Sequence, residues 1–195
     1  MTLVIKFNMK KFLTVIIILI ALLAKAQTIS LSNAPYEIPK GSYLKDIDNT
    51  LPLFTGSWSS DFEGNHVLLF ITDKVENYPI NLATTNYYSD VLLMKYTIND
   101  SDNNQLVSTI NKTLSDVNII STFTSSDKKR IGFVYKGEAC GIGRGLIYLT
   151  LIDATHIKWE YKSTGGIIDP NKCSGYSPDI KSYIPRSSDL IFTKQ

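Results

Sequence analysis

Hydrophobic and polar residues alternate along most of the chain, which is the pattern that half-buried β-strands produce. The clearest alternation lies in residues 156–162, where Lys158 and Glu160 separate three apolar side chains. Residues 146–152 are rich in β-branched and aromatic residues, which predicts a second strand. Residues 153–155 between the two segments are short enough for a hairpin loop. One face of this predicted hairpin would lie in a core and the other in water.

The same alternation, interrupted by turn-forming residues, predicts about nine strands. Asp, Asn, Ser and Gly gather in the gaps, notably in residues 61–65, 99–104 and 125–127, and they favour turns through side-chain hydrogen bonds or positive φ. Short strands at regular spacing predict an all-β fold, either an antiparallel β-barrel or a β-sandwich. The predicted strands are residues 56–60, 66–72, 87–98, 105–110, 117–123, 131–136, 146–152, 156–162 and 189–193.

Two segments depart from this regular pattern. Within residues 105–117, apolar residues also recur at the spacing of a helix face, beginning at Leu106. Strand and helix both remain open there, with strand favoured. Residues 163–188 contain two adjacent glycines, three prolines and a cysteine, and they predict a long irregular loop that needs to be held against the rest of the fold.

The first 26 residues have the layout of a signal peptide. Lys10 and Lys11 precede an apolar run of 13 residues, and a small-x-small site follows at residues 24–26. The run is shorter than the ~20 apolar residues needed to cross a bilayer. We therefore expect cleavage after Ala26, export to the periplasm or the extracellular space, and contact with a membrane only through the signal peptide before cleavage. The expected organisation is a signal peptide at residues 1–26, an extended N-terminal segment at 27–50 and a single β-domain at 51–195.

The charge of the chain does not favour a nucleic-acid partner. The whole sequence has 20 basic and 18 acidic residues, but the predicted signal peptide holds four lysines and no acidic residue, which leaves a net charge of −2. The longest basic run, residues 128–130, is better explained as a solvated turn than as a phosphate-binding surface. We expect no nucleic-acid partner.

Cys140 and Cys173 are the only cysteines, and export would place them where disulfides form. A disulfide between them is therefore favoured. It would tie the long loop to the turn before residue 146 and, in the chain-entropy model, stabilise the fold by about 3–4 kcal/mol. The alternative, a nucleophilic Cys140 with His156 as its base, needs an unpaired thiolate and is disfavoured.

No sequence motif fixes a reaction, a metal or a cofactor. The glycines of residues 137–145 do not form a dinucleotide loop, because Leu146 takes the place of the third glycine and a strand is expected to follow. Residues 100–104 alternate as in calcium loops, but Gln105 and Asn111 replace the required glycine and glutamate. The acidic residues offer no pair that sequence alone can place across a cleft. We expect no catalytic residues, no metal and no cofactor.

Aromatic residues are the remaining signal, with 11 tyrosines and two tryptophans. Exposed aromatic rings can stack on sugars or line a ligand site, although strands also favour these residues for packing. Packing is the favoured explanation for most of them. The candidate ligand-lining residues are Tyr88, Tyr96, Tyr148 and Tyr161.

The sequence Phe54-x-Gly56-x-Trp58 resembles the G-x-W element with which lipocalins begin their first barrel strand. The resemblance implies a lipocalin-like barrel, in which Gly56 permits a close backbone approach and Trp58 plugs one end. Lipocalins cover this tryptophan with an arginine from the last strand, where this chain offers Lys194. We expect Gly56, Trp58 and Trp159 to be structural, barrel-closing residues.

Four motifs carry a second resemblance: Phe54-x-Gly56-x-Trp58, Tyr88-x-Asp90-x-Leu92-x-Met94-x-Tyr96, His156-x-x-Trp159-Glu160 and the terminal Phe192-Thr193-Lys194-Gln195. Together they resemble a family of small exported Bacteroidetes proteins of unknown function. The resemblance covers most of the chain after the signal peptide and implies an export signal and a β-rich fold, with no catalytic residue carried over.

The sequence therefore limits the function only to a class. The favoured expectation is an exported, non-enzymatic β-domain that binds a small apolar ligand, a glycan or an envelope partner. One alternative is a hydrolase of glycans or envelope material with an unrecognised pair of carboxylates. The other is a structural or interaction protein of the cell envelope.

Overall fold

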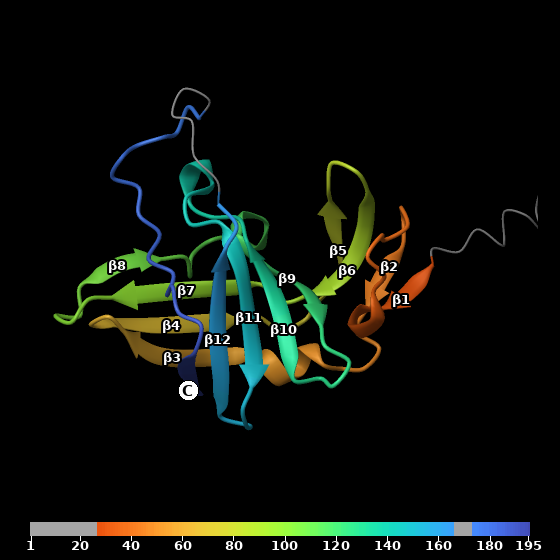
Figure 1. Ribbon diagram of the computed structural model, residues 1–195, viewed down its shortest axis with the longest axis horizontal. Coiled ribbons are helices and arrows are strands. Elements are labelled where there is room, and N and C mark those ends of the chain that lie inside the picture. Colours follow the sequence, from red (N-terminus) through yellow and green to blue (C-terminus); the bar gives the residue numbers. More distant parts are fainter. Residues whose placement is uncertain (1–26, 166–172) are drawn as a thin grey trace, which may run out of the picture.

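The computed structural model describes residues 27–165 and 173–195, and most of their regular structure is β-strand (Figure 1), as the alternation predicts. The signal peptide predicted for residues 1–26 lies outside the described residues. The strands are β1 (Thr28–Ser30), β2 (Tyr43–Lys45), β3 (Gly56–Phe62), β4 (Asn65–Ile71), β5 (Val75–Asn81), β6 (Asn86–Val91), β7 (Met94–Asn99), β8 (Gln105–Ser108), β9 (Ile119–Thr124), β10 (Arg130–Tyr135), β11 (Gly145–Leu151), β12 (His156–Ser163) and β13 (Leu190–Lys194). Four short 3₁₀ helices join them: η1 (Leu31–Asn33), η2 (Leu51–Phe54), η3 (Leu114–Asp116) and η4 (Ala139–Gly141).

Nine strands form one antiparallel sheet in the order β8-β7-β4-β3-β13-β12-β11-β10-β9. The sheet curls into a half-barrel, with β3, β4 and β7 crossing behind β10–β12 in Figure 1. The predicted hairpin is confirmed, because β11 and β12 pair from Gly145–Ser163 to Leu151–Ile157. At one corner the chain before β7 meets β9, where Ser121 N donates to Leu92 O at 2.9 Å. This contact brings two distant parts of the curled sheet together.

A second, four-stranded sheet has the order β1-β2-β6-β5 and lies at one side of the half-barrel (Figure 1). Its β1–β2 and β2–β6 pairs are parallel, whereas β5 and β6 form an antiparallel hairpin. The buried carboxylate of Asp90 on β6 accepts hydrogen bonds from the Tyr43 hydroxyl and from Asp46 N, the latter at 3.0 Å. These bonds fix the hairpin to β2, so residues 27–50 supply strands and a support for β5–β6.

The concave side of the half-barrel is filled with large side chains. Trp58, Tyr96, Phe133 and Trp159 are all at most 1% exposed. Such dense packing is what an interior sealed by its own side chains requires. The fully buried residues of this cluster also include Phe54, Leu69, Leu92, Met94, Ile119, Ile131, Tyr135, Ile147, Leu149, Ile157 and Phe192.

Three details differ from the predicted strands. The predicted strand 87–98 is wrong as one element, because Leu92 and Leu93 carry the chain from the small sheet to the large one between β6 and β7. Strands β1, β2 and β5 were not predicted at all, since residues 27–50 were expected to form only an extended segment. In residues 105–117 the helix alternative is wrong: β8 ends at Ser108, and a single 3₁₀ turn, η3, follows. The described chain therefore has 13 strands instead of about nine, and nine of them belong to the larger sheet.

Candidate functional site

Of the three residues predicted to close the barrel, Trp58 and Trp159 are buried, and Gly56 is exposed at the start of β3. Trp58 is fully buried and donates from Nε1 to Phe54 O at 3.1 Å, and Lys194 Nζ lies 5.0 Å from the centre of its ring. Gly56 has φ +110°, a backbone conformation that other residues rarely adopt. Trp159 is fully buried, and its Nε1 donates to Pro185 O at 3.0 Å. Barrel closure by these residues remains a prediction that the burial of the two tryptophans supports.

The four candidate ligand-lining tyrosines do not come together. Tyr96 is buried in the half-barrel, and Tyr161 donates its hydroxyl proton to Gly143 O at 2.9 Å. Tyr148 points away from the interior, where the guanidinium of Arg130 lies 4.3 Å from its ring centre. Tyr88 is 45% exposed on the β5–β6 hairpin. No single cavity with a described lining contains all four, and the guanidinium of Arg130 already covers one ring face of Tyr148.

Two buried tyrosines share one carboxylate in a polar cluster. Tyr96 and Tyr135 both donate their hydroxyl protons to Glu138 Oε1, at 2.6 and 2.5 Å. Burial, strengthened by the nearby Glu138 carboxylate, raises the pKa of both phenols above their ordinary value. Both tyrosines are therefore neutral donors at physiological pH, and the cluster fixes the loop that carries Glu138.

The predicted disulfide between Cys140 and Cys173 is confirmed, with a Cα–Cα distance of 5.9 Å. It joins η4 to the segment that resumes at residue 173, so it holds the late loop against the turn before β11, as expected. A pairing of Cys140 with His156 as nucleophile and base is excluded, because the sulfur is in the disulfide.

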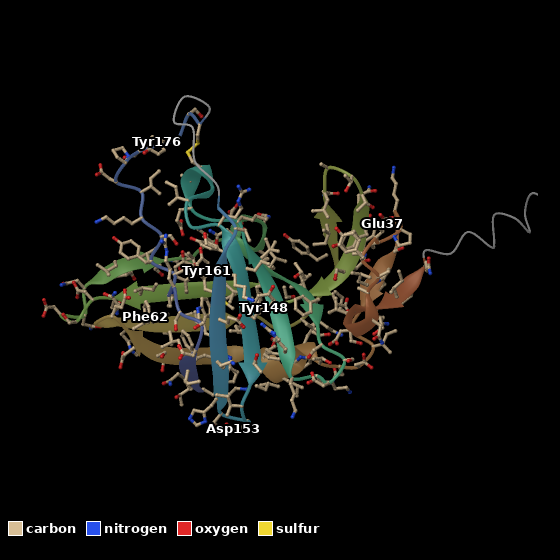
Figure 2. The ribbon with its side chains drawn as sticks, in the orientation of Figure 1. Glu37, Phe62, Tyr148, Asp153, Tyr161 and Tyr176 are labelled. Atoms are coloured by element: carbon tan, nitrogen blue, oxygen red, sulfur yellow. A yellow bond between two sulfur atoms is a disulfide. The ribbon has the colours of Figure 1, made fainter. Side chains whose placement is uncertain are left out.

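Two acidic residues, Asp127 and Asp153, line one surface cavity of about 540 Å³. The carboxylates of both accept hydrogen bonds from backbone N–H groups within turns. Asp153, at the tip of the β11–β12 hairpin (Figure 2), accepts from the Thr155 backbone N–H at 2.7 Å. These turn hydrogen bonds lower the pKa of Asp153 to about 2, and bonds from Ser125 and Lys129 lower the pKa of Asp127. A general acid needs a pKa near the working pH, so neither carboxyl suits that role.

The described residues contain a more promising cavity outside the half-barrel. A groove of about 480 Å³ separates the β5–β6 hairpin from the convex face of β9 and β10. Figure 1 shows the hairpin standing beside these two strands and leaning away from them at its tip. The lining residues are Tyr78, Pro79, Ile80, Asn81, Leu82, Tyr87, Ser89, Ile120, Ser121, Thr122, Val134 and Lys136.

Strand pairing explains why each wall of the groove is apolar. On the hairpin, Ile80 lies opposite Tyr87 in the register of β5 and β6. On the half-barrel, Val134 lies opposite Ile120 in the register of β10 and β9. Cross-strand partners share one face of a sheet, so each wall presents a pair of hydrophobic side chains to the space between the two sheets.

The base of the groove is closed by a second hydrophobic cluster. Val91, Leu93, Val117 and Ile120 are at most 5% exposed and pack with the half-buried residues of β5, among them Tyr78. Ile120 therefore belongs both to this small core and to the groove. The groove is open between two walls that meet at a packed base, instead of being a flat surface.

Sequence reasoning missed the groove residues. Tyr88 was a candidate, but its neighbour Tyr87 faces the cavity, because consecutive strand residues point to opposite faces. The alternation of Tyr87, Ser89 and Val91 was a usable signal for this face. The sequence of the partner strand β5 contains almost no such signal. Pro79 and a register shift between Val75 and Tyr78 interrupt its strand pattern.

Comparison of the sequence with known protein families gives a match. A family model matches residues 9–195, nearly the whole chain. The chain belongs to DUF6705, a family of unknown function. This result confirms the predicted resemblance to a family without an assigned function. Comparison with curated proteins and with solved structures gives no match.

DUF6705 membership and the described fold leave the function open. The disulfide fits a protein that is exported to an oxidising compartment. In the described ranges, 27–165 and 173–195, the chain forms no helix that is both long and apolar enough to cross a membrane.

Proposed function

We propose that this protein is an exported, non-enzymatic binding protein that takes up an apolar ligand in the groove between the β5–β6 hairpin and strands β9 and β10. The observation that carries the proposal is the contrast between a filled interior and an open apolar groove. Binding of an apolar ligand is stabilised by a free energy of about 25 cal/mol for each Å² of apolar surface that the groove removes from water.

The dimensions and composition of the groove support this function. Its volume of about 480 Å³ lies within the range of small-molecule sites, which are mostly apolar with a few polar groups. Apolar and aromatic side chains come from both walls, and the lining also includes the polar residues Asn81, Ser89, Ser121, Thr122 and Lys136. The predicted signal peptide and the disulfide support export.

The hydrolase alternative has less support. Asp127 and Asp153 line one cavity, but turn hydrogen bonds keep the pKa of each carboxyl low. The groove itself has no carboxylate in its lining. Binding without catalysis is therefore the function that the described residues support best.

Nile red, a neutral apolar dye whose fluorescence rises in apolar surroundings, tests the proposal. We expect the purified protein to bind it with a micromolar Kd. Leu82→Asp and Ile80→Asn, which place polar groups on the hairpin wall, should each weaken binding at least tenfold. Leu82 is 57% exposed, so its replacement should leave the fold intact.

Leu106→Asp is the matched control, because Leu106 is 37% exposed on β8 and does not line the groove. Its dye binding and thermal midpoint should match those of the unmodified protein. A protein that fails to bind Nile red, or groove variants that bind as tightly as the control while remaining folded, would rule out the proposed function.

A further inference from the structure

Charge is distributed unevenly around the groove. Lys136 is the only lysine, arginine, aspartate or glutamate among the lining residues. It follows β10 directly, and Lys136 N donates to Asn118 O at 2.8 Å, which fixes its backbone beside the start of β9. The side chain is exposed, so the ammonium group can keep its hydration while its stem lies along the apolar wall.

No carboxylate competes for Lys136 in the part of the chain that the structure describes. The ion pairs within residues 27–165 and 173–195 involve other groups, and Lys136 takes part in none of them. A neighbouring cavity shares Leu82 and Tyr87 with the groove, and its lining includes Glu37 and Lys40, one charge of each sign. The groove therefore has a local excess of positive charge at an apolar surface.

We propose that the ligand of this groove is an anionic amphiphile, a single alkyl chain ending in a carboxylate, with Lys136 binding the carboxylate. This inference rests on the proposed function, because the chain must occupy the apolar walls. Ile80, Tyr87 and Val134 contact the alkyl chain, while its charged end stays beside the lysine and water. An ammonium and a carboxylate attract each other more strongly next to apolar walls than in bulk water.

The alkyl chain and the carboxylate of the ligand should each contribute to the binding affinity, and the two contributions can be measured separately. Each methylene that enters the groove should tighten binding roughly fourfold, because burying one stabilises the complex by ~0.8 kcal/mol. The carboxylate should increase the binding affinity by about a further fivefold, which is the upper end of the range for a solvent-exposed ion pair. The first effect depends on the walls of the groove and the second on Lys136 alone.

Displacement of Nile red by three probes of equal chain length separates these contributions. The probes are decanoate and decyltrimethylammonium, each below its critical micelle concentration, and decanol below its solubility limit, with the full protein at neutral pH. We expect decanoate to displace the dye at about fivefold lower concentration than decanol. Lys136→Gln should remove this difference, and Lys136→Glu should make decyltrimethylammonium the strongest competitor.

Lys45→Gln is the matched control, since Lys45 is exposed on β2 and does not line the groove. It should retain the preference for decanoate. Equal displacement by decanoate and decanol, or an unchanged preference in Lys136→Glu, would overturn this inference while dye binding still supported the groove. Absence of Nile red binding would remove the proposed function and this inference together.

Discussion

The interior of the half-barrel and the groove outside it are both built from alternating hydrophobic residues, yet the first is filled and the second is open. Inside, Trp58, Phe133 and Trp159 are at most 1% exposed. Outside, Ile80 and Val134 remain half-buried on facing walls. The interior is enclosed mainly by one curled sheet and is filled by its side chains together with those of Leu44 and Phe54. The groove lies between two sheets, and the second hydrophobic cluster closes it only at its base.

The largest expected effect lies in the filled region. Trp159→Ala should lower the free energy of unfolding by about 3–5 kcal/mol, because it leaves a cavity in a packed core and deprives Pro185 O of its donor. Urea denaturation followed by circular dichroism would measure this change. Tyr88→Ala, at a position 45% exposed, should lower the free energy of unfolding by only about 0.5 kcal/mol. Equal losses of stability at the two positions would contradict the difference between a filled interior and an open exterior.

Loss of the disulfide should have the next largest effect on stability. Replacing Cys140 and Cys173 together by serine should cost about 3–4 kcal/mol, since a cross-link between residues 33 apart restricts the unfolded chain. The measurement is again urea denaturation, with the dye-binding assay run in parallel. Nile red binding should persist, because neither cysteine lines the groove; its loss in a folded variant would show that the two regions are coupled.

Much of the filled region could be predicted from the sequence, and the groove could not. Regular alternation identified β12, β-branched and aromatic residues identified β11, and the short segment between them indicated the hairpin. Two cysteines in a chain that is predicted to be exported indicated the disulfide. The run from Val91 to Met94 hid a strand break, because all four residues are buried as the chain passes from one sheet to the other.

The groove requires information that local sequence patterns do not contain. Its walls combine β5–β6 with β9–β10, segments some 40 residues apart. Strand β5 contains Pro79 and a positive φ at Asn77, so its sequence does not have the regular pattern of a strand. No sequence motif distinguishes Lys136 from the other lysines, whereas the fold places it in the lining of an apolar groove.

A smaller effect should follow from loosening the support of the hairpin. Asp90→Asn removes a buried carboxylate that accepts from the Tyr43 hydroxyl and from Asp46 N, and it should cost about 2–3 kcal/mol. Because the same bonds hold β6 against β2, Nile red binding should weaken as well. Thermal unfolding and dye titration of this variant would test the link; unchanged dye affinity would show that the groove walls do not depend on Asp90.

The smallest expected effect appears only at alkaline pH. Burial and the hydrogen bond to Asp90 raise the pKa of Tyr43 to about 12, and burial raises the pKa of Tyr96 and Tyr135 as well. A raised folded-state pKa stabilises the protein below the unfolded value of about 10, and for Tyr43 this contribution is lost between about pH 10 and 12.

Phenolate absorbance during an alkaline titration measures this behaviour. Tyr43, Tyr96 and Tyr135 should remain protonated at about pH 11 for as long as the fold persists. In the Tyr43→Phe variant, the late ionisation near pH 12 should decrease by one group. Ionisation of every tyrosine near pH 10 in a folded protein would contradict a filled interior.

Methyl-resolved NMR during a titration with decanoate tests most directly where a ligand binds. Saturable shifts should appear at Ile80, Leu82, Ile120 and Val134, which line the groove, while Leu149, deep in the half-barrel, should not shift. Saturable shifts centred on Leu149 and its neighbours, with the groove methyls unchanged, would contradict the assignment of ligand binding to the space between the two sheets.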